Sequence, residues 1–301
     1  MILKPLAIED QEILTPYIDK RSIPNCEYCF ATLYLWNKRY NIRYAKFEHY
    51  ILLIEEFEGK TYAIMPLCEE SYFKEATETL IHYFHSLSLP VEILVTDEIY
   101  KNFIEENYKD QFEITTNRDQ YDYLYDAEAL RTLKGKKLSK KRNHLNSFKK
   151  EYEGRWRYEE IYSDKNREIC EFVNGWADDK DEDAGMLADE LVGVCKAIEQ
   201  MEKLDVKVGA IYIDDELKAV TIGSIMNHDK EAVIHIEKAD PEVRGLYQAI
   251  NQEFLIHAYP KVELVNREDD LGLEGLRKSK LSYYPIDLIK KYNILEKDNT
   301  I

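Results

Sequence analysis

The stretch VKVGAIYIDDELKAVTIGSIMNHDKEAVIHIE, residues 206–237, decides the fold class of this chain. It contains three apolar runs, and the pair of aspartates between the first two is a turn signal, so the runs predict antiparallel strands. A helical pattern over residues 244–258 follows, and a further apolar run at 262–265 comes directly after it. We therefore expect an α/β (α+β) protein with a mixed, mostly antiparallel sheet flanked by helices. The first three strands are expected at residues 206–213, 217–225 and 232–237.

The first part of the chain follows the same plan. Three strands, one helix and one further strand are expected at residues 42–47, 50–57, 60–67, 72–86 and 91–95. The passages 81–97 and 255–267 read alike, which indicates duplication of a domain. We expect two similar domains, residues 1–130 and 131–301, with the working site in the second.

This order of elements is that of the N-acetyltransferase (GNAT) fold. In that fold the fourth and fifth strands splay apart, and an acyl donor lies between them. By analogy, the donor would lie between residues 232–238 and 262–266 of this chain. The expected architecture is therefore two GNAT-like acyltransferase domains in tandem.

The composition is that of a folded, acidic protein. The chain has 301 residues, 45% of them hydrophobic, and a formal net charge of -17, which repels nucleic acid at long range. No apolar run approaches the roughly 18–20 residues that a membrane-spanning helix needs. The N-terminus lacks a secretory signal pattern, so we expect a cytoplasmic protein without a transmembrane segment. Five cysteines, an odd number spread thinly, fit reduced thiols.

No metal site is predicted. Cys26 and Cys29 have the spacing of one zinc ligand pair, but no second pair follows at a suitable distance, so we expect both to pack in the interior. The acidic run at residues 178–183 lacks the spacing and the glycine of a calcium loop, and we expect a solvated linker there.

The segment from residue 134 to residue 150 is strongly basic. It holds eight Lys or Arg and no acidic residue, and its apolar residues fall on one helical stripe. A helix over residues 136–150 could bind the phosphates of tRNA or of a nucleotide-linked donor, or it could be a solvated helix face. The absence of compensating acidic residues favours phosphate binding. The candidate phosphate ligands are Lys137, Lys140, Lys141 and Arg142.

The third strand of the second half carries polar residues next to the expected donor position. Alternation along the strand predicts His235 and Glu237 on one face, opposite Ile234 and Ile236. A carboxylate there, from Glu237 or from Asp240, could take a proton from an attacking amine or hydroxyl. A polar pair on an exposed sheet face is the alternative.

The turn before the next helix is where acetyltransferases hold coenzyme A. A glycine-rich loop at a helix N-terminus binds the diphosphate through its backbone N–H groups. Only Arg244 and Gly245 match that pattern here, so acyl-CoA is a possible donor without firm support, and no cofactor is firmly implied.

The segment from residue 266 to residue 285 is the densest in polar residues. It leaves a strand and enters a helix, at the end of the strand where α/β proteins bind ligands. Arg277 and Lys280 could stabilise an oxyanion, although a capped surface helix would also explain part of the pattern. The candidate cleft residues are His235, Asn266, Glu268, Asp270, Lys278 and Tyr284.

Several of these passages resemble one family. The chain is similar to the phosphatidylglycerol lysyltransferase C-terminal-domain-like proteins, and the resemblance spans nearly its whole length. It rests on residues 27–66, on 140–148, on 237–240, on 266–280 and on Tyr284-Pro285.

The resemblance implies a tandem GNAT fold related to the Fem-type aminoacyltransferases. It implies transfer of an aminoacyl or acyl group, with aminoacyl-tRNA as a possible donor and a small molecule, a peptide or a lipid head group as acceptor. This chain lacks the membrane helices of the full-length lipid synthases, which puts a lipid acceptor in doubt. A coenzyme A-dependent N-acetyltransferase and a non-catalytic binding protein on the same scaffold are the alternatives.

Overall fold

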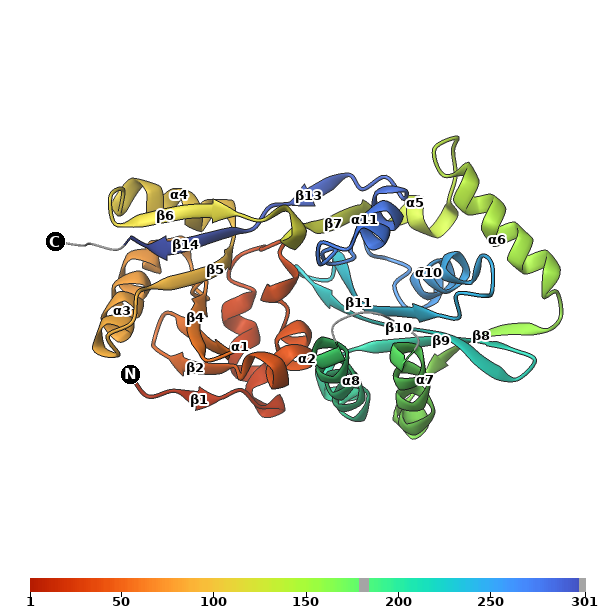
Figure 1. Ribbon diagram of the computed structural model, residues 1–301, viewed down its shortest axis with the longest axis horizontal. Coiled ribbons are helices and arrows are strands. Elements are labelled where there is room, and N and C mark those ends of the chain that lie inside the picture. Colours follow the sequence, from red (N-terminus) through yellow and green to blue (C-terminus); the bar gives the residue numbers. More distant parts are fainter. Residues whose placement is uncertain (179–183, 298–301) are drawn as a thin grey trace. The chain divides into compact units, whose positions relative to one another are not determined.

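The computed structural model describes residues 1–178 and 184–297 (Figure 1). The chain forms two compact units. The first unit is Met1–Tyr121 together with Ile289–Ile301, and the second unit is Asp122–Leu288. Apart from Asp178, the acidic run expected to form a linker lies outside the described residues.

The first unit is built on one seven-stranded sheet in the order β1-β2-β3-β4-β5-β14-β6. Neighbouring strands are antiparallel, except that β4 and β5 are parallel. Its strands are β1 (Lys4–Pro5), β2 (Arg43–Lys46), β3 (Ile51–Phe57), β4 (Lys60–Ile64), β5 (Glu92–Thr96), β6 (Phe112–Thr116) and β14 (Tyr292–Glu296). Its helices are η1 (Ile8–Asp10), α1 (Gln11–Ile18), η2 (Cys26–Tyr28), α2 (Phe30–Tyr40), η3 (Glu70–Tyr72), α3 (Phe73–Ser86), α4 (Glu98–Asn107) and η4 (Arg118–Gln120).

The second unit repeats this plan with a sheet in the order β13-β7-β12-β11-β10-β9-β8. Here β11 and β12 form the parallel pair. Its strands are β7 (Asp122–Asp126), β8 (Trp156–Ile161), β9 (Lys207–Ile213), β10 (Glu216–Met226), β11 (Glu231–Ala239), β12 (Leu264–Asn266) and β13 (Asp287–Ile289). Its helices are α5 (Ala127–Thr132), α6 (Ser139–Glu151), η5 (Ser163–Lys165), α7 (Asn166–Asp178), α8 (Ala184–Glu199), α9 (Met201–Leu204), α10 (Leu246–His257) and α11 (Glu274–Leu281).

Helix α10 forms the centre of the core on one face of the second sheet. Its apolar residues Leu246, Ile250 and Phe254 are buried in one hydrophobic cluster with residues of α5, α6 and the strands. Figure 1 shows α6 and α10 on one side of this sheet and α7 and α8 on the other. A Cβ at Gly223 on β10 would meet the ring of Phe254 at 3.0 Å, so only glycine lets α10 approach this closely.

The two-part, mostly antiparallel α/β architecture is confirmed, but the division of the chain differs from the expected boundary near residue 130. Strand β7 already belongs to the second sheet, and β14 returns to the first sheet, where it pairs with β5 and β6. Local patterns predict a strand but not its partner, because pairing depends on residues far away in the chain.

Two further findings concern the cysteines and the membrane. Cys170 on α7 and Cys195 on α8 form a disulfide, so the expectation of reduced thiols is wrong for this pair. Cys26, Cys29 and Cys68 form no disulfide and are buried. No helix among the described residues is long and apolar enough to cross a bilayer.

Candidate active site

The site is built where strands β11 and β12 part. Their parallel pairing runs only from Glu231 and Leu264 to Val233 and Asn266, whereas β11 continues to Ala239. Beyond this point the two strands are joined by side chains instead of backbone hydrogen bonds. This is the splayed arrangement that the order of elements predicts.

A β-bulge decides which way the side chains of β11 face. The register between β10 and β11 shifts at Ile222 and Gly223, which leaves His235 as the extra residue. Glu237 therefore faces α10, where Asn251 donates a hydrogen bond to it. His235 instead bonds Ser224, and Ser224 faces away from α10 because its neighbour Gly223 contacts that helix. The prediction that His235 and Glu237 share a face is wrong, because strict alternation fails at a bulge.

On the α10 face, a buried ion pair spans the two strands. Arg267, just after β12, donates from Nη2 to Glu237 Oε1 at 2.8 Å, and each side chain is only 10% exposed. The second carboxylate oxygen of Glu237 accepts the amide of Asn251 at 2.9 Å. Burial works against the charged guanidinium, but Glu237 outweighs it, so the pKa of Arg267 is raised. Both oxygens of Glu237 are therefore engaged.

Aromatic rings and one lysine complete this face. The guanidinium of Arg267 lies 4.9 Å from the ring centre of Tyr283 and 5.7 Å from that of Tyr125. The ammonium of Lys141, from α6, lies 4.0 Å from the ring centre of Tyr283. Burial and the charge of Arg267 lower the pKa of Lys141 to about 8. The result is a cationic, aromatic-lined position between α6 and the end of β12.

On the opposite face, His235 connects β10 with the turn after β12. Its Nε2 lies 2.8 Å from Ser224 Oγ, and its Nδ1 lies 2.9 Å from Glu268 Oε1. The His235 side chain is 1% exposed. A neutral imidazole that donates from Nδ1 to the carboxylate and accepts the Ser224 hydroxyl at Nε2 satisfies both contacts.

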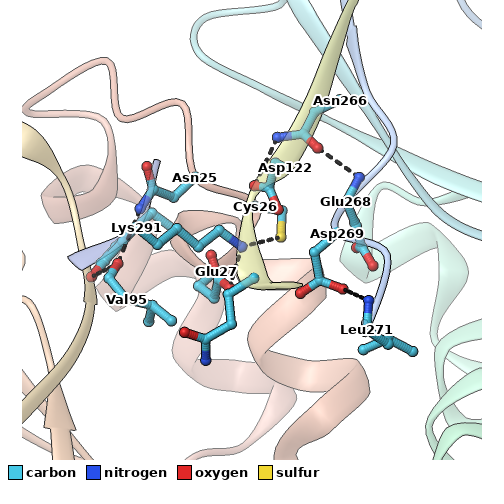
Figure 2. Close-up of polar contacts among 12 residues, drawn as sticks. Asn25, Cys26, Glu27, Val95, Asp122, Asn266, Glu268, Asp269, Leu271 and Lys291 are labelled. Atoms are coloured by element: carbon cyan, nitrogen blue, oxygen red, sulfur yellow. Dashed lines mark hydrogen bonds and ion pairs between the residues drawn. The ribbon is translucent and has the colours of Figure 1, made fainter. Parts of the chain in front are cut away.

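The turn after β12 is held by hydrogen bonds to its backbone. Asn266 accepts the amide N–H of Glu268 at 2.7 Å and donates to Asp122 at 3.1 Å (Figure 2). The ammonium of Lys280 donates to the carbonyl oxygens of Arg267, Glu268 and Asp269. Burial, and then the charge of Arg267, lower the pKa of Lys280. The three N–H donors of Lys280 therefore hold the turn and are already used, although an oxyanion would require them.

Arg277 is engaged in the same way. It donates from Nε and Nη2 to the two oxygens of Asp270, at 2.8 and 2.7 Å. Asp270 is buried and also accepts the hydroxyl of Tyr123. Burial raises the pKa of Asp270, but the bonds from Arg277, Tyr123 and Gly272 outweigh it and hold that pKa at about 2. This pair anchors the start of α11.

Helix α6 begins at Ser139, three residues later than expected, and the basic residues of the segment 134–150 divide into two groups. Arg142 donates to the carbonyl oxygens of Leu133 and Gly135, and Lys149 pairs with Glu253 at 2.7 Å. These two basic residues stabilise the fold. The side chains exposed to solvent are Lys134, Lys136, Lys137, Lys140 and Lys150.

Helix α6 also covers the start of α10. Gly245 has φ +88°, and a Cβ there would clash with the carbonyl oxygen of His144 and lie 2.9 Å from Phe148 Cβ. Arg244 donates to His144 Nδ1 at 3.3 Å, and burial followed by the charge of Arg244 lowers the pKa of His144. This packing argues against a diphosphate at the turn where acetyltransferases hold coenzyme A.

The remaining candidate residues lie at the edge of the site. Asp240 pairs with Lys218 at 3.4 Å, and its Oδ1 accepts the N–H of Glu242. Lys278 and Tyr284 are exposed, and the ammonium of Lys137 lies 5.6 Å from the ring centre of Tyr284. Sequence reasoning singled out Glu237 but not the cation that pairs with it. No local pattern marks Arg267, Ser224, Asn251, Tyr125 and Tyr283.

The corresponding position in the first unit is filled by its own chain. The pairing of β4 and β5 ends at Ile64 and Leu94. There the hydroxyl of the buried Tyr28 accepts the N–H of Met65 at 3.0 Å and donates to the carbonyl of Val95 at 3.3 Å.

A buried lysine, Lys291, lies directly before β14 in the first unit. Lys291 is fully buried and donates to Glu27 at 2.5 Å, with its ammonium 3.6 Å from Cys26 Sγ (Figure 2). These bonds satisfy the lysine in the interior, as a buried charge requires.

The sequence of this chain matches one protein family and one curated relative. The family described as "Phosphatidylglycerol lysyltransferase, C-terminal" matches residues 21–295. An uncharacterized protein of Mycoplasmoides gallisepticum is 34% identical over 176 residues, which are 56% of this chain and 54% of that protein. The chain thus spans about half the length of this curated relative.

Solved structures share the fold across nearly the whole chain. A conserved protein of unknown function from Bacteroides thetaiotaomicron has a TM-score of 0.92 and 29% identity, and the match covers 99% of this chain and 100% of that one. L-PGS from Bacillus licheniformis has a TM-score of 0.69 and 13% identity, over 97% and 93%. A tandem GNAT protein from the clavulanic acid pathway has a TM-score of 0.53 and 11% identity, over 98% of both chains. The last two show the fold alone, and that fold is the tandem GNAT fold.

Proposed function

Because this chain belongs to the phosphatidylglycerol lysyltransferase C-terminal family, we propose that it transfers an aminoacyl group from aminoacyl-tRNA, using the site between β11 and β12. The observation that carries the proposal is the position of α6. This helix covers the turn that would hold coenzyme A, and it presents lysines to solvent.

The charge distribution supports a polyanionic donor. The whole chain carries a formal charge of -17, so a cluster of exposed lysines at the start of α6 and just before it is a local exception. Lys136, Lys137 and Lys140 are exposed, and no acidic residue lies within α6 before its last position, Glu151. Lysines of this kind bind backbone phosphates without reading sequence.

The site supplies a fixed cation for the transfer step. In the attack on an ester, negative charge develops on the carbonyl oxygen, and a preorganised donor lowers the barrier. The expected oxyanion ligands are already engaged, because Arg277 binds Asp270 and Lys280 binds three carbonyl oxygens. Arg267 is the better candidate, because its charge is held by a single carboxylate between two aromatic rings.

The acceptor is defined by chemistry alone. It must offer an amine or a hydroxyl that attacks the donor ester directly. A small molecule, a peptide and a lipid head group each meet this requirement.

Binding of bulk deacylated tRNA and of acetyl-CoA, each at two salt concentrations, tests the donor. The test variant replaces Lys136, Lys137 and Lys140 by alanine. The control replaces Lys60, Lys230 and Lys261, three exposed lysines outside the basic segment 134–150, and therefore changes the net charge equally. We expect wild-type tRNA binding to weaken with salt, and the test variant to lose at least about tenfold in affinity with a shallower salt dependence.

The second arm measures transfer itself. Bulk tRNA charged with labelled amino acids is offered with phosphatidylglycerol vesicles or with a mixture of peptides, and label in the acceptor is counted. Binding of acetyl-CoA in place of tRNA would replace the proposal by a coenzyme A-dependent acetyltransferase. Binding of neither would favour a non-catalytic binding protein.

A further inference from the structure

Glu268 differs from the other carboxylates beside the parting strands. Its Oε1 lies 2.9 Å from His235 Nδ1, but its Oε2 receives no hydrogen bond from any residue that the structure describes. The side chain is 19% exposed, so this oxygen is reachable. Glu237 and Asp270, by contrast, have both oxygens engaged. Glu268 thus keeps an acceptor position that neither Glu237 nor Asp270 has.

The backbone of Glu268 is held in an uncommon conformation. Its φ is +53°, in the left-handed region that a long side chain rarely adopts. Its N–H donates to Asn266, and its carbonyl accepts the N–H of Tyr123 at 3.2 Å and the ammonium of Lys280 at 3.3 Å. A strained residue fixed by three separate partners is a feature of functional sites.

The side chain of Glu268 is fixed as well. His235 arises from the β-bulge of β11 and is anchored on its other nitrogen by Ser224 at 2.8 Å. The bulge therefore turns the imidazole toward the end of β12, and the imidazole holds one oxygen of the carboxylate. Only the second oxygen is left to meet a substrate.

We propose that Glu268 is the catalytic base of this site and that His235, anchored by Ser224, is its positioning residue. The inference rests on the proposed function and names the group that takes the proton in the transfer step. The acceptor nitrogen or oxygen forms a bond with the carbonyl carbon of the donor ester, and its proton passes to Glu268 Oε2. The bond from that carbon to the ribose oxygen breaks, and the departing oxygen takes the proton. Donor ester and acceptor thus become acylated acceptor and free tRNA, with no other reactant.

The charged groups near Glu268 come from four elements. They are His235 on β11, Lys280 on α11, Asp122 on β7 and, in the same turn, Arg267 and Asp269. Lys280 contacts the backbone of Glu268, and Asp122 reaches it only through Asn266. His235 is the one titratable side chain in direct contact with the carboxylate among the described residues.

The kinetic test compares Glu268→Gln with Glu263→Gln. Glu263 lies directly before β12, and its side chain is exposed, so the control makes the same chemical change outside the site. The readout is single-turnover loss of labelled amino acid from charged bulk tRNA with phosphatidylglycerol vesicles. We expect Glu268→Gln to lower the rate by about 100-fold or more and to remove the acid limb of the pH profile. His235→Gln should lower the rate less and shift that limb.

The second measurement needs no substrate. The chain has 7 histidines, and the His235 resonance is identified by its loss in His235→Gln. His235 Nδ1 lies 2.9 Å from Glu268 Oε1, so Glu268→Gln should shift the ring resonances of His235, and Glu263→Gln should leave them in place.

The outcomes separate the two proposals. Transfer by Glu268→Gln at the wild-type rate with an unchanged pH profile overturns the role of Glu268 and leaves the transferase proposal standing. Absence of transfer by the wild type defeats the transferase proposal for these substrates. Unchanged ring resonances of His235 in Glu268→Gln overturn the contact between the two side chains in either case.

Discussion

Arg267 and Glu237 join the parted ends of β12 and β11 through one buried hydrogen bond of 2.8 Å between their side chains. The pair occupies the position where the order of elements predicts an acyl donor. Its energetic role follows from its burial, because a charge left without its partner in the interior is strongly destabilising.

Replacing Arg267 by Met should lower the free energy of unfolding by about 3–5 kcal/mol, since Glu237 would be left buried without a cation. Replacing Arg155 by Met is the control, because the pair of Arg155 with Asp214 is exposed to solvent and should stabilise the protein far less. Chemical denaturation at neutral pH measures both. Equal effects of the two changes would contradict the assignment of Arg267 to the interior.

Gly245→Ala should destabilise the second unit by about 2–4 kcal/mol. The new Cβ would combine a left-handed backbone with a clash against α6, and these two costs add. Gly154→Ala isolates the first cost, because Gly154 has φ +72° and an added Cβ there meets nothing within 4 Å. We expect it to cost about 1 kcal/mol in thermal or chemical unfolding. A result in which Gly154→Ala is the worse of the two would argue against close packing of α6 on α10.

Stability of the first unit should depend on pH through Glu55. Burial, and then the charge of Glu27, raise the pKa of Glu55 from 4.5 to about 8. The folded state therefore holds a proton that the unfolded state releases above pH 4.5, so stability is greatest below that pH and falls as pH rises toward 8.

Glu55→Gln should remove this dependence and stabilise the protein by about 2 kcal/mol at pH 7. Glu58→Gln, at an exposed neighbouring turn, is the control and should leave the slope unchanged. Unfolding free energies of the wild type and both variants, measured from pH 5 to pH 8, give the three slopes. A slope that is the same in wild type and Glu55→Gln would exclude a proton on Glu55.

The sequence determined the elements of this protein and their repetition. Apolar periodicity and turn residues are local, so they predicted β2–β5 and β9–β12, the helix before β12 and the basic amphipathic helix α6. They did not predict the outer strands β1, β6, β7, β8 and β13, or β14. The same local patterns placed the candidate site after β12, where Asn266, Glu268 and Asp270 form a hydrogen-bonded turn.

Only the tertiary structure decided how those residues are used. The bulge that puts His235 and Glu237 on opposite faces is a shift in the pairing of β10 with β11. The sequence of either strand alone does not predict it. Lys280 and Arg277 read as oxyanion ligands in sequence, but packing places carbonyl oxygens and Asp270 next to them. The partners of a charged side chain are set by contacts between distant segments, and these contacts form only when the chain is folded.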